Sequence, residues 1–317
     1  MFGIKTNKLI TDKEIIRRTI LRRIEPAGIF PSEEDAIKTL QNGSKKIYLG
    51  IDPTGPNIHI GHSIPLLYLK GLWEIGHRPV ILIGDFTARI GDPTGKETAR
   101  KPLTKKEVKD NMKNYLGQVY KILPKRSFEV KYNSSWFFRM SFEDVIKLTS
   151  QITVQQMIVR DMFQERIKNE RPIGVHEFLY PLMQGYDSVA MKIDGEVGGN
   201  DQTFNMLVGR DLEKKLLNKD KLVFATQLLV DKSTGKKMSK SEGDLITLAD
   251  NPNDMFGKTM KIVPDSFIYG MFKLCTEKPQ EWIDENNKEK IENNPNQYKK
   301  ELAFELVKMY HGEKEAE

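Results

Sequence analysis

Cysteine is almost absent from this sequence of 317 residues, which contains only Cys275. One cysteine cannot form a disulfide within the chain, and such scarcity is typical of proteins kept in a reducing cytoplasm. Apolar runs of membrane-spanning length are also lacking, and charges are scattered through residues 1–28. We therefore expect a cytoplasmic protein without membrane contact, whose first residues form an amphipathic helix rather than a signal peptide.

Acidic residues are outnumbered: 44 Asp and Glu stand against 50 Lys and Arg, giving a net charge of +6 and a pI of about 9.0. A basic excess favours binding to a polyanion, because clustered cations attract phosphates over long range. It is equally typical of an ordinary lysine-rich surface. Charge alone leaves both interpretations open, so function has to be sought in the motifs.

Strand-like apolar runs alternate with helical patterns along most of the chain. The strand-like runs cover residues 45–51, 78–84, 127–133, 195–199 and 221–230. Helical patterns include those over residues 104–123, 141–168, 174–191 and 202–218. This alternation predicts an α/β domain built on a doubly wound parallel sheet with right-handed crossovers.

After residue 250 the strand signal disappears and helical patterns are separated by Asn and Pro. The length favours about two domains. We expect a helical arm over residues 1–45, an α/β domain over 46–230 with a helical insertion at about 115–190, and a basic loop followed by a helical domain over 231–317.

The segment GIDPTGPNIHIGH, residues 50–62, follows the first strong strand. Ligands of doubly wound sheets lie at such strand-to-helix turns, and phosphates favour the N-terminus of the following helix. His59 and His62 are three residues apart and therefore face the same side of that helix. They could donate hydrogen bonds to a triphosphate or merely cap the helix. A metal site is not expected, because no third His, Cys or carboxylate follows at ligand spacing.

A second candidate loop, DKSTGKKMSKSEGD, covers residues 231–244 after the last strand. Lys237 and Lys240 flank small and hydroxyl-bearing residues, and two such ammonium groups can neutralise a departing pyrophosphate. Neither this loop nor GDPTGK (91–96) has the glycine spacing of a P-loop. Taken alone, the loop would be an ordinary solvated lysine-rich turn.

Taken together, HIGH (59–62) and KMSKS (237–241), about 180 residues apart in that order, resemble the class I aminoacyl-tRNA synthetases. A four-letter match arises by chance about once in 10⁵ positions. Two such motifs, each after a predicted strand, make coincidence implausible. The resemblance implies a Rossmann-like catalytic domain.

Polar residues also recur on one face of the helix predicted over residues 174–191. Tyr180, Gln184 and Asp187 lie at i, i+4 and i+7, provided that the helix continues through Pro181. Buried polar groups without partners are costly, so such a stripe indicates a polar ligand or network, unless it simply faces solvent. Further polar residues, Asp92 and the pair Asp201 and Gln202, follow other strands.

These stretches are similar to the tyrosyl-tRNA synthetases, and the likeness covers roughly residues 30–310. YLGIDPTGPNIHIGH, IGDPTGK, YPLMQGYD and VGGNDQ occur in the order typical of that family. The resemblance implies that Tyr48 and Asp187 bind the substrate phenol. It assigns Asp92, Tyr180 and Gln184 to the ammonium and Gln202 to the vicinity of the carboxylate. The implied ATP-binding set is Gly50, Asp52, His59, Gly61, His62, Gly199, Asp201, Lys237, Met238 and Lys240, of which His59, His62, Lys237 and Lys240 would act on the phosphates.

The implied reaction is attack of the tyrosine carboxylate on the α-phosphate of ATP, followed by transfer of the tyrosyl group to tRNA(Tyr). ATP would enter with Mg²⁺ as a substrate complex, and no structural metal is expected. Family precedent also implies a homodimer, for which apolar runs between 115 and 190 could supply a surface. A further RNA-binding domain, common in bacterial members, would lie beyond Glu317.

Three alternatives compete with this interpretation. Tryptophan-specific relatives usually have Asn in place of His62 and lack the Tyr48 and Asp187 pair. A small nucleotidylyltransferase can share the HxGH turn but not the helical region after residue 250. A non-enzymatic RNA-binding protein on a synthetase fold would be expected to lose His59, His62 or the lysines of the basic loop.

Overall fold

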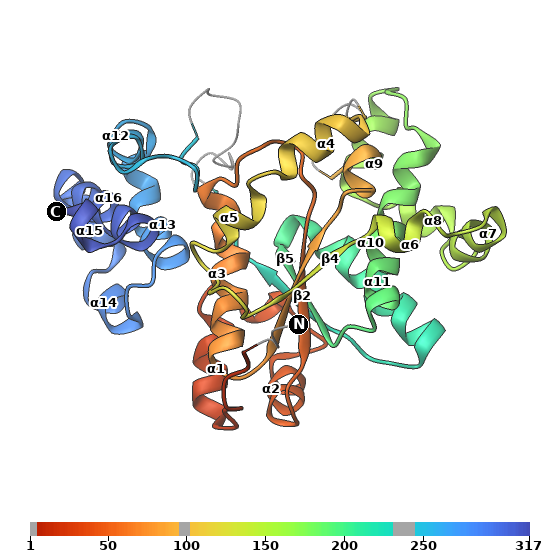
Figure 1. Cartoon of the computed structure of the whole chain (residues 1–317), viewed down its shortest axis with the longest axis horizontal. Helices are drawn as coiled ribbons and strands as arrows, with labels where there is room; N and C mark the ends of the chain where they lie inside the picture. The colour runs from red at the N-terminus through yellow and green to blue at the C-terminus, as the bar shows by residue number, and fades with distance from the viewer. Residues whose placement is uncertain (1–4, 95–101, 231–244) are drawn as a thin grey trace.

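A six-stranded sheet forms the centre of the computed structural model, which describes residues 5–94, 102–230 and 245–317 (Figure 1). The strands are β1 (Ile29–Phe30), β2 (Lys46–Ile51), β3 (Arg78–Ile83), β4 (Glu129–Tyr132), β5 (Gly195–Gly199) and β6 (Leu222–Thr226). Their order across the sheet is β1-β6-β5-β2-β3-β4, and every neighbouring pair is parallel except β1 with β6. The predicted α/β class with a doubly wound sheet is confirmed.

The order of the strands reverses direction at the middle of the sheet. From β2 the chain adds β3 and β4 on one side and then returns to add β5 and β6 on the other. In open parallel sheets, this reversal leaves a crevice outside the carboxyl ends of the two central strands, where ligands bind. Here those strands are β2 and β5.

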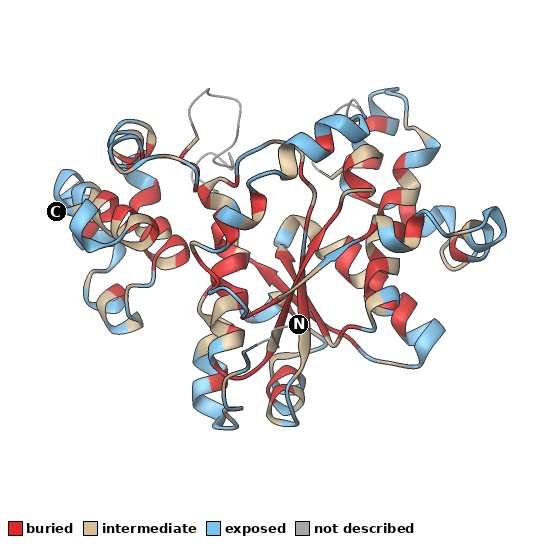
Figure 2. Ribbon diagram, viewed as in Figure 1, coloured by how far each residue is buried: buried red, intermediate tan, exposed pale blue. Residues whose placement is uncertain are grey.

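The inner strands β2, β3, β5 and β6 are mostly buried, as expected for parallel strands covered by helices (Figure 2). Side chains alternate between faces along β2. Ile47 and Leu49 pack into the main apolar core with helix α3 (Ile60–Glu74), whereas Tyr48 packs on the other face with Val80 and Ile193. Alternation therefore places Tyr48 on the face away from α3.

The helices before β6 cover both faces and extend to one side of the sheet (Figure 1). Besides α3 they are α1 (Lys13–Leu21), η1 (Pro26–Gly28), α2 (Glu33–Gln41), η2 (Thr87–Arg89), α4 (Lys105–Met112), α5 (Tyr115–Val119), α6 (Ser134–Phe137), α7 (Phe142–Thr149), α8 (Val154–Ile158), α9 (Asp161–Lys168), α10 (Val175–Met191), η3 (Asn200–Gln202) and α11 (Thr203–Leu217). Helices α10 and α11 pack closely against each other, and α11 contacts β5 and β6.

Two sequence predictions were wrong in detail. The helical pattern over 141–168 is divided into three helices. Thr153 caps the start of the second in a capping box, whereas the third begins after Arg160 without a side-chain cap. The strand predicted over 221–230 ends at Thr226. The two-residue strand β1 was missed, because two residues are too few to show a period.

The chain after residue 250 is helical, as predicted, and its helices gather at one end of the molecule (Figure 1). They are α12 (Pro252–Ile262), η5 (Asp265–Phe267), α13 (Ile268–Cys275), α14 (Gln280–Glu285), α15 (Lys288–Asn293), α16 (Pro295–His311) and α17 (Glu313–Ala316). Buried Arg23, which follows α1, donates hydrogen bonds to the carbonyl oxygens of Leu274 (2.8 Å) and Thr276 (2.6 Å). Apolar core side chains continue from the sheet into these helices.

Cys275 is completely buried in that shared core, and burial raises the pKa of its thiol to about 12. The thiol is therefore protonated at neutral pH and serves packing rather than chemistry. No helix within the described ranges combines the length and the apolar character that crossing a membrane requires.

Glu213 on α11 is a buried carboxyl group, and no side chain in the described part of the protein donates a hydrogen bond to its oxygens. Burial raises the pKa of Glu213 from 4.5 to about 7, although Lys221 and Lys219 oppose the shift. Between those two pH values the unfolded chain loses its proton while the folded protein keeps it, so wild-type stability falls as pH rises. We predict that Glu213→Gln removes this loss, which amounts to about 3 kcal/mol at most.

The measurement is the difference in Tm between Glu213→Gln and wild type, followed from pH 5 to pH 8. The difference should grow in favour of the variant as pH rises. A constant difference across this range would contradict the raised pKa of the buried carboxyl group.

Candidate active site

A cavity of about 820 Å³ opens at the carboxyl ends of the central strands. That volume lies within the range of small-molecule sites. Residues from the ends of four strands line it, among them Tyr48 and Asp52 around the end of β2, Gly84 after β3, Glu196 on β5 and Thr226 on β6. The cavity therefore coincides with the crevice at which the strand order reverses.

The HIGH segment forms one wall of this cavity at the start of α3. His59 is the N-cap of α3, and its Nδ1 accepts a hydrogen bond from the Gly61 amide at 3.1 Å, which leaves the ring proton on Nε2. The rings of His59 and His62 stack with centroids 3.7 Å apart. A Cβ on Gly61 would lie 3.0 Å from the His59 ring, so glycine lets the pair sit close to the helix start. The predicted same-side arrangement of the two imidazoles is confirmed.

The chain that leaves the 231–244 segment runs directly beside the His pair. Thr247 forms a β-bridge with His59, and the Ile60 amide donates to the Ile246 carbonyl at 2.9 Å. On the other side of that segment, Leu229 lines the cavity. The flanks of the basic loop are thus held at the cavity. Lys237, Met238 and Lys240 themselves lie outside the described residues.

Asp52 is held in place by hydroxyl groups from two other elements. Tyr180 Oη on α10 donates to one carboxylate oxygen at 2.9 Å, and Thr87 Oγ1 donates to the other at 2.7 Å. A Cβ on Gly84 would lie 1.9 Å from Asp52 Oδ1, so this turn requires glycine. Burial raises the pKa of the Tyr180 phenol well above its usual value, with the nearby Asp52 and Asp92 charges adding to the effect.

Asp187 lies at the buried end of the cavity, with an exposed fraction of 3%. Its carboxyl oxygens accept hydrogen bonds from Trp136 Nε1 (2.9 Å) and Asn133 Nδ2 (3.3 Å). Burial raises the pKa of Asp187 well above the usual range for a carboxyl group. Helix α10 continues through Pro181, as the polar stripe required, and brings Asp187 to the cavity beside Tyr180 and Gln184.

Asp92 and Gln202 meet across the cavity from loops that follow β3 and β5. Gln202 Nε2 donates to Asp92 Oδ2 at 2.7 Å, and the Thr94 amide donates to Asp92 Oδ1 at 2.9 Å. Arg160, which is 9% exposed, donates to Thr94 Oγ1 at 2.9 Å. The helical segment that contains Arg160 thereby supports the loop of Asp92.

All predicted site residues within the described ranges line this one cavity. They are Tyr48, Gly50, Asp52, His59, Gly61, His62, Asp92, Tyr180, Gln184, Asp187, Gly199, Asp201 and Gln202. The structure therefore brings together residues separated by up to 154 positions (48 to 202) in the sequence.

Sequence reasoning missed a second group of polar residues that support these. They are Thr87, Asn133, Trp136, Ser188, Glu196, Asn205 and Lys221. Only Glu196 gave a signal, as a charged residue in the glycine-bounded strand GEVGG.

The sequence matches the family of class I tRNA synthetases (W and Y) over residues 40–317. It is 43% identical over 311 residues to a tyrosine–tRNA ligase of Carboxydothermus hydrogenoformans, covering 96% of this chain and 74% of that protein. A tyrosine–tRNA ligase of Thermotoga maritima is also 43% identical, covering 90% of this chain and 72% of the relative. The fold resembles a tyrosyl-tRNA synthetase of Archaeoglobus fulgidus solved with L-tyrosine (TM-score 0.76, 21% identity, 96% and 99% of the two chains).

Proposed function

The chain belongs to the class I tRNA synthetases (W and Y), and from this premise we propose that it activates L-tyrosine with ATP and transfers the tyrosyl group to tRNA(Tyr). The structural support for the proposal is a single cavity. One part of it has hydrogen-bond acceptors and hydroxyl groups suited to a phenol and an ammonium group. Another part has the stacked imidazoles at the start of a helix. The tryptophan alternative and the non-catalytic alternative are set aside, because the relatives at 43% identity are tyrosine–tRNA ligases.

The phenol of the substrate is assigned to Tyr48 and Asp187. Both side chains line the cavity and both are almost fully buried. A hydroxyl donor beside a carboxyl group satisfies a phenolic oxygen and its proton, whereas phenylalanine would leave both protein groups without partners. The pocket therefore selects tyrosine because phenylalanine would leave two buried polar groups without hydrogen-bond partners.

The ammonium and carboxylate of tyrosine are assigned to the next groups along the cavity. Asp92, Tyr180 and Gln184 carry the oxygen atoms that would accept from the ammonium, and Gln202 lies beside Asp92. The carboxylate is the nucleophile, so no side chain has to form a covalent intermediate. Catalysis then depends on positioning and on charges that act on the phosphates.

The triphosphate of ATP is assigned to the N-terminus of α3. The positive end of the helix dipole favours anions there, and the imidazoles of His59 and His62 would act as donors. Lys237 and Lys240 would stabilise the leaving pyrophosphate, supported by the anchoring of both flanks of their loop at the cavity. Mg²⁺ enters with ATP as part of the substrate. Gly50, Asp52, Gly199 and Asp201 would surround the adenosine and the reacting groups.

The test is exchange of labelled pyrophosphate into ATP, measured with each of tyrosine, tryptophan and phenylalanine. We expect efficient exchange only with tyrosine, together with charging of tRNA(Tyr). Exchange with tryptophan, or none with any amino acid, would refute the assignment. A nucleotidylyltransferase would show no dependence on an amino acid.

We also propose that the protein is a homodimer. Of the thirteen exposed large apolar side chains in the described residues, seven lie between residues 138 and 175. They are Phe138, Phe142, Ile146, Val154, Val159, Ile167 and Val175. Apolar side chains concentrated in this way support a protein–protein contact. The segment overlaps the part of the chain from which the sequence predicted one.

Phe142→Glu is predicted to convert the dimer into a monomer, because it puts a charge on the most exposed of these side chains, 80% exposed. Sedimentation velocity measures the change. Ile15→Glu on α1, where Ile15 is 46% exposed, is the matched control and should leave the dimer intact. A monomeric wild type, or a Phe142→Glu dimer of undiminished affinity, would contradict the proposed interface.

The helices after residue 250 are proposed to contact the anticodon side of tRNA, as one domain together with the 231–244 loop.

The cytoplasm is the proposed compartment, supported by the single buried cysteine.

A further inference from the structure

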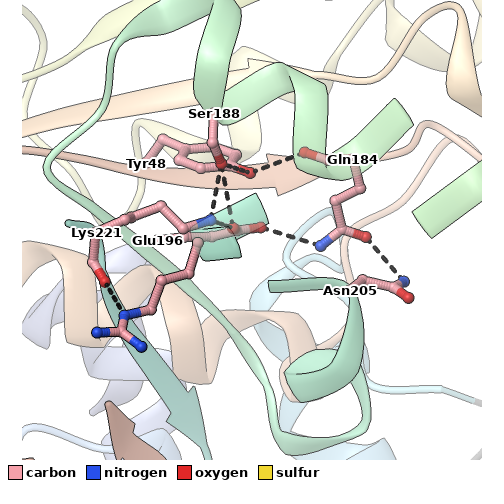
Figure 3. A network of polar contacts seen from close by, with 7 residues as sticks. Tyr48, Gln184, Ser188, Glu196, Asn205 and Lys221 are labelled. Atoms are coloured by element: carbon pink, nitrogen blue, oxygen red, sulfur yellow. Dashed lines mark hydrogen bonds and ion pairs between the residues drawn. The ribbon is translucent and has the colours of Figure 1, made fainter. Parts of the chain in front are cut away.

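A buried ion pair between Lys221 and Glu196 lies beside Tyr48 (Figure 3), and Glu196 itself lines the cavity. Lys221 Nζ donates to Glu196 Oε2 and, at 2.8 Å, to Ser188 Oγ. Lys221 is 0% exposed, Ser188 is 0% exposed and Glu196 is 2% exposed. Removing two charges from water is costly unless the pair is well bonded, so a pair in this place calls for a reason other than stability.

The register of the sheet places the pair there. Tyr48 on β2 is the direct cross-strand neighbour of Glu196 on β5, and Lys221 immediately precedes β6 on the same face. Helix α11 leaves room for the ammonium because residue 209 is glycine. A Cβ on Gly209 would lie 2.5 Å from Lys221 Nζ. The space that Lys221 occupies is therefore built by three separate elements.

The lysine is connected to Tyr48 by a chain of hydrogen bonds through a hydroxyl group. An ammonium group only donates, so Lys221 occupies a lone pair of Ser188 Oγ and Ser188 must donate its own proton elsewhere. The acceptors within reach of that proton are Tyr48 Oη at 3.2 Å and Glu196 Oε2 at 3.5 Å. Ser188 Oγ thus joins the Lys221 ammonium to the Tyr48 hydroxyl, the nearer of these two groups.

The Tyr48 hydroxyl also has a proton to donate. The Gln184 carbonyl oxygen lies 3.5 Å from Tyr48 Oη, at the limit of a hydrogen bond, and the Glu196 carboxylate interacts with the same hydroxyl. A phenolic oxygen in the cavity would offer that hydroxyl a further partner. The hydrogen bonds therefore link Lys221, Ser188 and Tyr48 in a chain that the Tyr48 hydroxyl can extend to a ligand.

Glu196 fixes the orientation of the Gln184 side-chain amide. A carboxylate only accepts, and Glu196 Oε1 accepts from Gln184 Nε2 at 3.0 Å. Gln184 Oε1 accepts from Asn205 Nδ2 at 3.0 Å and keeps a second lone pair. The amide therefore presents an oxygen, the group that an ammonium needs, rather than its NH₂.

We propose that Lys221 and Glu196 are positioning residues for tyrosine selection, which act through Ser188 on the Tyr48 hydroxyl and through the Gln184 amide. The proposal rests on the proposed function, because it concerns how the same cavity recognises a phenol and an ammonium. Neither Lys221 nor Ser188 lines the cavity, so both act through other residues.

Ser188→Ala tests the relay while leaving the ion pair in place. We expect kcat/KM for tyrosine in pyrophosphate exchange to fall about tenfold, as for one lost hydrogen bond. The KM for ATP and the weak activity with phenylalanine should change by less than about twofold, because neither uses the Tyr48 hydroxyl.

The decisive readout is the same substitution in a Tyr48→Phe background. If Ser188 acts through the Tyr48 hydroxyl, Ser188→Ala has no further effect once that hydroxyl is gone. A loss that persists in the Tyr48→Phe background, or that is equal for tyrosine and phenylalanine, would overturn the proposal.

Lys221→Met with Glu196→Gln removes both charges together and avoids leaving one of them unpaired. The double variant should lose tyrosine selectivity at least as strongly as Ser188→Ala. Lys219→Met, on the same loop but bonded to Asp194 and the Lys192 carbonyl oxygen, is the matched control and should leave selectivity unchanged. If circular dichroism shows that the double variant does not fold, the Ser188→Ala measurements still test the proposal.

The proposed function and the positioning role can be refuted separately. A wild-type protein without tyrosine-dependent exchange would refute the proposed function itself. A wild type that selects tyrosine, with Ser188→Ala retaining full selectivity, would refute only the positioning role.

Discussion

Replacing His62 by alanine is expected to slow the formation of tyrosyl-adenylate by about two to three orders of magnitude, the usual effect of losing one donor to a developing charge. Tyrosine affinity should stay within about twofold, because the phenol and ammonium contacts lie elsewhere in the cavity. His62 is preferred to His59 for this test, since His59 also caps α3 and its loss would destabilise the helix.

Rapid-quench measurement of adenylate formation gives the rate, and equilibrium dialysis with labelled tyrosine gives the affinity. His59→Asn is a useful companion, because asparagine retains capping without an imidazole. His176→Ala removes an exposed histidine that does not line the cavity and serves as the control. Loss of tyrosine binding with an unchanged chemical rate would remove the His pair from its assigned role.

Replacing Asp187 by alanine is expected to abolish most discrimination between tyrosine and phenylalanine. The substitution removes the buried acceptor for the phenolic proton, so kcat/KM for tyrosine should fall by about three orders of magnitude or more while phenylalanine is little affected. A tyrosyl-tRNA synthetase is the standard example of this effect, at about 10⁵-fold discrimination. That figure is a benchmark for the family rather than a value calculated for this cavity.

The ratio of kcat/KM for the two amino acids in pyrophosphate exchange is the measurement. Asp211→Ala, which removes an exposed carboxylate from α11, should leave the ratio unchanged. Equal losses for tyrosine and phenylalanine would mean that Asp187 supports the cavity without contacting the phenol.

The parallel sheet was predictable because its strands are buried on both faces and therefore read as continuous apolar runs, such as RPVILIG at 78–84. The first division within 141–168 depends on the capping side chain of Thr153, which competes locally with an apolar pattern that continues across it. The second, before α9, has no capping side chain that could have signalled it. Strand β1 exists only because β6 offers it a partner.

The residues that line the cavity were predictable from their motifs, since each motif follows a strand and parallel strands end at one edge. Their supporting residues were not, because Lys221 and Ser188 meet only through the register of β5 and β6 and the packing of α10. A lysine before an apolar strand looks like a solvent-exposed residue. Its burial depends on Gly209 in a helix that precedes it by 12 residues (209 to 221).

The central claim is that one cavity binds the phenol of tyrosine at Tyr48 and Asp187 and the phosphate of the adenylate at His59 and His62. A crystal structure with a non-hydrolysable tyrosyl-adenylate analogue tests it most directly. We predict the phenol within hydrogen-bond distance of Tyr48 Oη and Asp187, and the phosphate at the start of α3. An analogue bound in the reverse direction, or at another surface, would contradict the account.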